Sequence, residues 1–519
     1  MSSSKQPQDE PDSEPEMLAA EDALEEIPDD ADGDIPMDSD DEDGEEINLS
    51  NDGIAYFEHH KDSVFTIAQH PTRPTLIATG GSEGDTDDAP GKGYVFDTAG
   101  VPPRPLLPEN YSGAPPAAPT ALDPLFHIDG HTDSINALAF TNPAGEYLLS
   151  GGLDGRLRAY AVSAGDKAAA PQIRFLEEAQ EVPEVNWVQA CPNGAAHPNV
   201  VALGASDGSV WVYQVDASAA PALQILQSYF LHQAPCSAGA WTPDGEMLAT
   251  VSEEGSLFVW DVFGSAAAAG VRSDNGMSVL ALDGSDARFE VEGGLYSVAC
   301  APTGAFLAVG GAGGAIKVVA LPRFGASAAA SSSGGGSRAG GGRRGGGGAA
   351  AGSDQQGGQI LASLHAQGDG VETLSFSPPG PAGTLLAAGS VDGSIALYDA
   401  QRSFQVRRLV GGAHGDFSVV KVEFVRGSPH LLTSCGMDGV VRRWDVRGTT
   451  AGAGAGGQQQ QQQAGQGASA SAAAAGLIKE WRGHRGDGEG GGVLGFVQGE
   501  TGERVVTAGD DGVVLVFEA

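Results

Sequence analysis

The sequence predicts an all-β protein, a β-propeller of eight blades. Two observations lead to this prediction: a short pattern recurs eight times, and the copies follow one another at blade spacing. In each copy a run of alternating apolar residues leads to a small-residue turn closed by Asp-Gly or a similar pair, and a strand ending in an aromatic residue follows. Each copy therefore predicts about four antiparallel strands, which is one propeller blade.

The turn pairs mark the successive copies. Gly adopts positive φ at little cost and a short Asp carboxylate accepts hydrogen bonds from nearby N–H groups, so both suit tight hairpin turns. The first copy, around residues 83–85, and the fifth are weak, so seven blades are the fallback. The other pairs are Asp154-Gly155, Asp207-Gly208, Glu254-Gly255, Gly313-Gly314, Asp392-Gly393, Asp438-Gly439 and Asp511-Gly512.

The two ends of the repeat region complement each other. Eight blades need about 340 residues, and residues 53–519 supply more than that, with several insertions. The final strand, Val513 to Phe517, leaves its blade one strand short, and the segment Ile54 to Phe57 offers the missing strand. Because an unpaired sheet edge invites aggregation, we predict that these two strands pair and close the ring.

Charge is distributed unevenly along the chain. The chain has 28 Lys and Arg against 68 Asp and Glu, a net charge of −40, and residues 1–52 hold 21 acidic residues and one Lys. This segment has no aromatic residue and few apolar ones, so we predict a disordered tail. The remaining charge, about −20 on the propeller, repels nucleic acid and anionic membranes and attracts basic partners. An acidic tail that only maintains solubility is the alternative.

Neither a targeting segment nor a metal site is evident. The N-terminus is polar and acidic, and no run of about 18 apolar residues occurs. The four cysteines are scattered without the spacing of a zinc site, and this indicates buried thiols in a reducing compartment: Cys191, Cys236, Cys300 and Cys435. We expect a soluble, monomeric protein of the cytoplasm, with the nucleus as an alternative, and no cofactor.

The repeats resemble those of the WD-repeat family. The shared marks are a His before the first strand, a Ser or Thr four residues before the turn Asp, and an aromatic-Asp pair at the end of the next strand. In that family the four residues form a hydrogen-bonded chain within a blade. The resemblance implies three such sets: His131, Ser150, Asp154 and Tyr160; His414, Ser434, Asp438 and Trp444; and His484, Thr507 and Asp511.

These residue types also occur in Ser-His-Asp hydrolases. Here, however, the set repeats at blade spacing and no G-x-S-x-G motif accompanies it. The sequence therefore favours a structural role for the sets and a protein that is not an enzyme.

Low-complexity insertions fall in one recurring position. The stretches at about 98–119, 325–358 and 448–476 each follow a third strand and precede the last strand of a blade. We call the face that carries the Asp-Gly turns the top face. The connection between third and last strands lies on the opposite face. Either the top face is kept open for a ligand, or surface loops simply tolerate low complexity. The few arginines of 325–358 favour a flexible linker over an RNA contact.

Acidic residues are frequent in the loops of the top face. Around a ring they would form a negative surface at the central channel, which suits an extended Lys/Arg-rich peptide bound through carboxylate–guanidinium pairs. The candidates are Glu83, Asp85, Asp87 and Asp88 in the loop 82–92, and Glu184, Glu253, Glu254, Asp369, Asp416 and Asp510 elsewhere.

The chain is also similar to the angio-associated migratory cell protein family and its fungal ribosome-assembly relative. The features in common are an acidic N-terminus before eight repeats, the opening His60 to Pro71, the entry Glu184 to Trp187 and the run Ala202 to Val215. The resemblance implies a dedicated chaperone. Its propeller would hold the basic N-terminal segment of a new large-subunit ribosomal protein until that protein joins the pre-60S particle.

Other functions stay open at this point. Animal members of the family are linked to signalling and cell migration, and a general scaffold such as a ubiquitin-ligase adaptor or a reader of histone tails would use the same face. The low-complexity insertions and the loop 82–92 are not features of the family.

Overall fold

The computed structural model describes residues 51–84, 86, 89–103, 118–163, 171–273, 276–322, 357–380, 383–448, 476–486 and 491–519. The predicted acidic tail therefore lies almost wholly outside the described residues. The compact unit considered below spans Leu49–Ala519.

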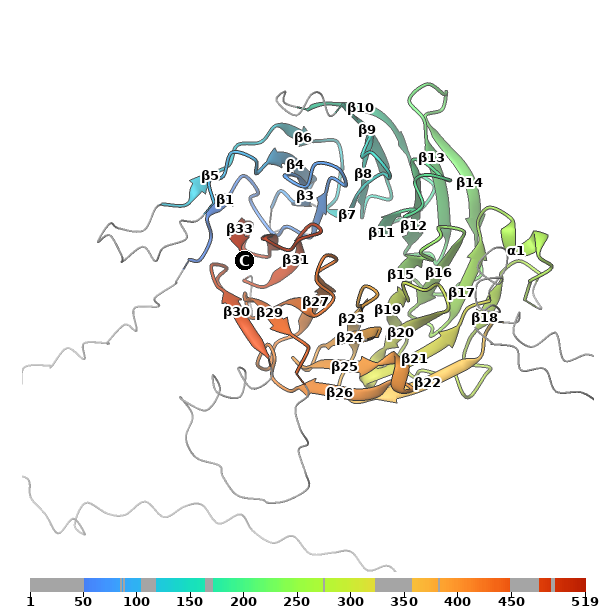
Figure 1. Cartoon of the computed structure of the whole chain (residues 1–519). Helices are drawn as coiled ribbons and strands as arrows, with labels where there is room; N and C mark the ends of the chain where they lie inside the picture. Colours follow the sequence, from blue (N-terminus) through green and yellow to red (C-terminus); the bar gives the residue numbers. More distant parts are fainter. Residues whose placement is uncertain are drawn as a thin grey trace, which may run out of the picture. The chain divides into compact units, whose positions relative to one another are not determined.

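In the described residues the strands form eight sheets, each one blade (Figure 1). The prediction of eight blades is confirmed. From the inner to the outer strand, blade 1 contains β2 (Thr66–Gln69), β3 (Leu76–Ser82), β4 (Gly91–Asp97) and β6 (Phe126–Ile128); blade 2 contains β7 (Ile135–Phe140), β8 (Tyr147–Gly152), β9 (Leu157–Ser163) and β10 (Gln172–Ala179); blade 3 contains β11 (Val185–Ala190), β12 (Val200–Ala205), β13 (Val210–Val215) and β14 (Leu223–Tyr229); and blade 4 contains β15 (Cys236–Trp241), β16 (Met247–Ser252), β17 (Leu257–Asp261) and β18 (Leu280–Leu282).

The second half of the ring repeats this order. Blade 5 contains β19 (Leu295–Cys300), β20 (Phe306–Gly311), β21 (Ala315–Ala320) and β22 (Ile360–His365); blade 6 contains β23 (Val371–Phe376), β24 (Leu385–Ser390), β25 (Ile395–Asp399) and β26 (Gln405–Val410); blade 7 contains β27 (Val419–Phe424), β28 (Leu431–Gly436), β29 (Val441–Asp445) and β30 (Leu477–Trp481); and blade 8 contains β31 (Val493–Val497), β32 (Arg504–Gly509), β33 (Val514–Glu518) and β1 (Ala55–Phe57). Short helices are α1 (Ser265–Ala268), η2 (Ala312–Gly314) and η3 (Ala400–Arg402).

The inner strands form a closed circle around the channel. Each contacts the inner strand of the next blade, from β2 through β7, β11, β15, β19, β23 and β27 to β31 and back to β2 (Figure 1). Every inner strand begins on the top face, since the loops that lead into it lie on the same side as the second-to-third-strand turns. Turn glycines such as Gly155, Gly393 and Gly439 have φ of 73°, 75° and 71°, which favours Gly at these positions.

The predicted closure of the ring is confirmed. β1 pairs antiparallel with β33, with Ala55 opposite Val516 and Phe57 opposite Val514. The first strand of the repeat region thus completes the last blade, and Phe57 is fully buried there.

A fifth strand on this blade was not predicted. β5 (Thr120–Ala121) pairs parallel with β1, and Arg504 donates hydrogen bonds to the carbonyl oxygens of Thr98 (2.8 Å) and Val101 (2.7 Å). Val101 and Leu122 are buried in the core between blades 8 and 1. Both ends of the predicted insertion 98–119 are therefore packed, and we call these ends, residues 98–103 and 118–122, the clasp.

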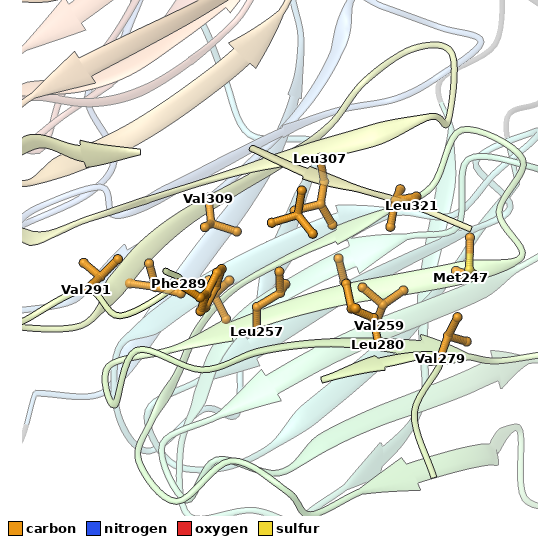
Figure 2. Close-up of a cluster of buried hydrophobic side chains, with 14 of the residues drawn as sticks. Met247, Leu257, Val259, Val279, Leu280, Phe289, Val291, Leu307, Val309 and Leu321 are labelled. Carbon is orange, nitrogen blue, oxygen red and sulfur yellow. The ribbon is translucent and has the colours of Figure 1, made fainter. Parts of the chain in front are cut away.

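The hydrophobic core is divided among the seams between blades. Each apolar cluster in the described residues joins two neighbouring blades, and one cluster lies at each of the eight seams. Figure 2 shows the seam of blades 4 and 5, where Leu257 and Val259 face Leu307 and Val309, and Phe289 of the connecting loop fills the space between them. The sheets pack face to face and bury this apolar surface, and this holds the blades in a ring.

The insertions occupy the expected position. Residues 98–119 lie between β4 and β6, 325–358 between β21 and β22, and 448–476 between β29 and β30. Their central parts lie outside the described residues.

Candidate functional site

One hydrogen-bonded set lies within blade 7. His414 lies 2.8 Å from Ser434 Oγ through Nε2 and 2.8 Å from Asp438 Oδ1 through Nδ1, and Trp444 Nε1 donates to Ser434 Oγ at 2.9 Å. Burial would raise the pKa of Asp438, but the hydrogen bond from His414 and the charge of Arg442 hold it below its ordinary value. The set ties the loop before β27 to β28 and β29.

A second set lies within blade 2. His131 Nδ1 lies 3.0 Å from Asp154 Oδ1, and its Nε2 lies 2.7 Å from Ser150 Oγ. The hydroxyl of Tyr160, in the position of Trp444, accepts from Arg158 Nε at 3.2 Å. Burial would raise the pKa of Asp154, and the hydrogen bond from His131 outweighs this and lowers it.

Blades 8 and 1 carry shorter sets. His484 lies 2.8 Å from Thr507 Oγ1 and 3.0 Å from Asp511 Oδ1. His60 pairs with Thr79 Oγ1 at 2.9 Å, and among the described residues its Nδ1 has no partner. Burial, and to a lesser degree His59, lowers the pKa of His60 to about 3.

The sequence analysis missed the set in blade 4. His232 lies 2.8 Å from Thr250 Oγ1, which also accepts from Trp260 Nε1 at 2.8 Å. The Nδ1 atom of His232 lies 2.6 Å from Ser256 Oγ, and Ser256 Oγ donates to Glu254 Oε1 at 2.6 Å. Ser256 thus connects His232 to Glu254, which stands where other blades have the turn Asp. The signal was a His 18 residues before Thr250, at a spacing close to that of blade 2.

Blade 6 uses Gln in place of His. Gln367 is buried, and its amide donates to Ser394 Oγ and to the carbonyl oxygen of Ser394, both at 3.0 Å. The Asp392 carboxylate accepts from Gly368 N at 2.6 Å. An uncharged amide therefore replaces imidazole in this blade.

The buried hydroxyls cannot serve as nucleophiles for an external substrate. Ser150, Ser434 and Thr507 are all 0% exposed, and Ser434 is already hydrogen-bonded to both His414 and Trp444. A substrate carbonyl has no access to these oxygens, so the geometry favours a structural role. The described residues also contain no group of three or more His, Cys, Asp or Glu side chains able to hold a metal ion.

The predicted acidic residues lie in loops of the top face. Glu83 lies in the β3–β4 turn, Glu253 and Glu254 in the β16–β17 turn, and Asp510 in the β32–β33 turn. Three others precede the inner strands of blades 3, 6 and 7: Glu184, Asp369 and Asp416. Asp85, Asp87 and Asp88 lie outside the described residues. The acids are thus spread around the ring on one face.

Four of these acids already have internal partners, and one of them is Asp369, whose Oδ1 accepts from Gly370 N at 2.7 Å. Glu254 accepts from Gln233 N at 3.0 Å as well as from Ser256, so its carboxylate holds a turn. Glu83 forms an ion pair with Lys61 at 2.9 Å, and Asp510 accepts from Ser63 Oγ at 2.6 Å. A peptide ligand at these carboxylates would compete with existing bonds, and their assignment as peptide ligands stays a prediction.

Five predicted acids are exposed: Glu184, Glu253, Glu254, Asp369 and Asp416. A further carboxylate, Glu372, was missed by the sequence analysis. Its residue is exposed at the start of β23, and partial desolvation of its carboxyl group and the charge of Asp369 raise its pKa. A nearby cation would relieve this repulsion.

No helix in the described part of the chain is long and apolar enough to cross a membrane.

Comparison with known proteins identifies relatives of this propeller. Residues 122–160, 223–261 and 358–399 match the model of the WD domain, G-beta repeat. A crystal structure of Sqt1 from Chaetomium thermophilum, bound to the N-terminus of the ribosomal protein L10, is 53% identical; the match covers 91% of this chain and 100% of that chain, with a TM-score of 0.73.

Two curated proteins are more distant. The ribosome assembly protein SQT1 of Saccharomyces cerevisiae is 31% identical over 45% of this chain and 47% of its own length, so the chain spans about half of that relative. The human angio-associated migratory cell protein is 22% identical over 76% of this chain and 71% of its own length. The eight blades, their internal sets and these similarities together show that the chain belongs to the WD-repeat β-propeller family, in the group that contains Sqt1 and the angio-associated migratory cell protein.

Proposed function

We propose that this protein is a non-catalytic chaperone in assembly of the large ribosomal subunit. It binds the N-terminal segment of a large-subunit ribosomal protein as a monomer and keeps that segment soluble. The observation that carries the proposal is the similarity to Sqt1, which was crystallised with the N-terminus of L10 and matches this chain over the whole propeller.

The charge of the top face supports a basic segment as the ligand. Glu184, Glu253, Asp369 and Asp416 are exposed on that face. Carboxylates arranged around a ring attract Lys and Arg side chains and raise the association rate of a basic peptide. The same charge disfavours nucleic acid and anionic membranes as partners on this face, and we place the protein in the cytoplasm, where ribosomal proteins are made.

A binding experiment with the L10 N-terminal segment tests the proposal. The Glu253→Lys and Asp416→Lys variants should each weaken binding several-fold, and affinity should fall steeply between 50 and 300 mM salt, because exposed charge pairs are screened. Glu500→Lys is the matched control, since Glu500 is exposed between β31 and β32 on the opposite face. Glu254 is unsuitable because its carboxylate holds a turn.

Two results would overturn the proposal. The first is no binding of the L10 segment at low salt. The second is equal weakening by Glu500→Lys and Glu253→Lys. Affinity purification from cytosol with mass spectrometry then distinguishes the proposed chaperone from a general scaffold. Ligase subunits or signalling receptors that co-purify in place of a ribosomal protein would indicate a general scaffold.

A further inference from the structure

The inner strands share an irregularity at the top of the channel. In blades 2 to 8 the pairing of the inner strand with its neighbour shifts after the first residue, so that one residue is bulged out of the ladder. A bulge re-aims one side chain and is often found next to binding sites. The bulged residues are Asn136, Asn186, Ser237, Tyr296, Glu372, Val420 and Leu494. In blade 1, Phe65 holds this position directly before β2.

Three of these side chains join neighbouring blades. Asn136 Nδ2 donates to the carbonyl oxygen of Asn186 at 3.0 Å, and Asn186 Nδ2 donates to that of Cys236 at 3.1 Å. Ser237 Oγ donates to the carbonyl oxygen of Leu295 at 2.6 Å. From blade 2 to blade 5, the bulged residues thus act as structural links.

The corresponding positions on the other side of the channel mouth hold apolar residues. The bulged positions of blades 7 and 8 hold Val420 and Leu494, and the corresponding position of blade 1 holds Phe65, on inner strands that contact one another. Val420 and Leu494 are partly exposed, and Val420 also packs against the core cluster between blades 7 and 8. Phe65 is 39% exposed, and so is Phe417, two residues before β27. We call these four residues the apolar arc. Exposing two phenylalanine side chains to water on one face costs free energy. A bound apolar group would cover them and remove that cost.

Exposed carboxylates adjoin the arc at its blade 6 and blade 7 end, where Asp416 directly precedes Phe417, and these charges favour a cation there. Lys421, next to Val420, forms an ion pair with Glu423 at 2.9 Å and donates to the carbonyl oxygen of Phe496 at 2.9 Å, so its charge is compensated. At the blade 6 end, Glu372 is exposed beside Asp369. An apolar surface thus ends at a pair of carboxylates.

We propose that the apolar arc binds an aromatic or long aliphatic side chain of the basic segment, while Glu372 and Asp369 bind a Lys or Arg next to it. This inference rests on the proposed function and narrows its ligand class: the segment carries apolar side chains among its basic ones. The arc supplies affinity that salt does not screen, and the acidic loops supply the screened part.

Two synthetic peptides of equal length and charge test the inference. One alternates Arg and Lys with Ser and Gly, and the other replaces some Ser by Phe and Leu. The double variant Phe65→Ala/Phe417→Ala should weaken binding of the second peptide on the order of tenfold with an unchanged salt slope, and leave the first unaffected. Both rings are partly exposed, so the fold should tolerate their loss.

Phe230→Ala is the control, since Phe230 is 61% exposed but follows the outer strand β14. The L10 segment should behave like the peptide with apolar residues. Equal affinity of the double variant and the natural protein for that peptide overturns the arc and leaves the proposed function intact. Failure of every basic peptide, L10 segment included, to bind the natural protein overturns both.

Discussion

At the scale of single residues, the buried histidines make stability depend on pH. Burial lowers the pKa of His232 from 6.5 to about 4 and that of His60 to about 3. Below pH 6.5 the unfolded chain binds protons at these positions that the folded chain does not, so their contribution to stability is complete above that pH and is lost as the pH falls. The lowered pKa values of Asp154 and Asp438 act only in more acidic solution, below the ordinary Asp value of 3.8.

The His232→Gln variant should reduce this pH dependence. Gln367 already fills the equivalent position in blade 6, so an amide is compatible with the blade. From pH 6.5 to 5 the free energy of unfolding should fall by about 2 kcal/mol less than in the natural protein. Urea titrations at both pH values measure it, and the exposed His127→Gln should change nothing. An equal fall in the His232→Gln variant contradicts the assignment.

Some residue roles were beyond prediction from the sequence. In the sets of blades 2, 7 and 8 the Ser or Thr always lies four residues before the turn Asp, so the hydrogen bonds of His131, His414 and His484 could be anticipated. Glu254 and Gln367 replace the expected residue types, and only their contacts show that they do related work. The apolar arc escaped notice because bulges depend on how neighbouring strands pair, and no local pattern marks Phe65 or Leu494.

At the scale of elements, the clasp stabilises the seam between blades 8 and 1. Arg504 binds two carbonyl oxygens of residues 98–101, and the amides of Thr120 and Leu122 donate to the carbonyl oxygens of Ile54 and Tyr56 at 3.0 and 2.9 Å. β5 has only two residues between Pro- and Gly-rich stretches, so the sequence indicated an insertion there and gave no sign of a strand.

We expect Arg504→Ala to lower the free energy of unfolding by about 2 kcal/mol, because a charged donor leaves two carbonyl oxygens unpaired. Hydrogen exchange at Thr120 and Leu122 should accelerate more than exchange in blade 4. Arg447→Ala is the control, since its ion pair with Asp445 is exposed and should contribute less than about 1 kcal/mol. Unchanged exchange at Thr120 and Leu122 would show that the clasp does not depend on Arg504.

At the scale of the whole molecule, charge and closure follow from sequence in different ways. Residues 53–400 hold 35 acidic and 15 basic residues, whereas residues 401–519 hold 12 of each. The propeller is thus acidic over blades 1 to 6 and neutral over blades 7 and 8, where the apolar arc is centred. Composition revealed the first property, but only the closed ring shows that β27, β31 and β2, which carry or directly follow three residues of the arc, adjoin one another.

Truncation tests the closure. A chain starting at residue 51 should unfold at the temperature of the full chain, whereas one starting at residue 58 lacks β1 and exposes the edge of β33. Removing Ala55 and Phe57, both 0% exposed, should cost at least 3 kcal/mol and lower the melting temperature. Calorimetry of both chains measures their melting temperatures, and the Phe57→Ala variant should give an intermediate value. Equal melting temperatures would mean that β1 is dispensable.

The pairing of Phe57 with Val514 also sets an order of events during synthesis. At roughly 5 to 20 residues per second, the partner strand of β1 leaves the ribosome about half a minute to a minute and a half after β1 itself. During that interval, blades already made can pack against one another. The ring stays open, however, and β1 stays unpaired until β33 has been made. A protein proposed to bind newly made chains therefore has an exposed, unpaired strand of its own for most of its synthesis.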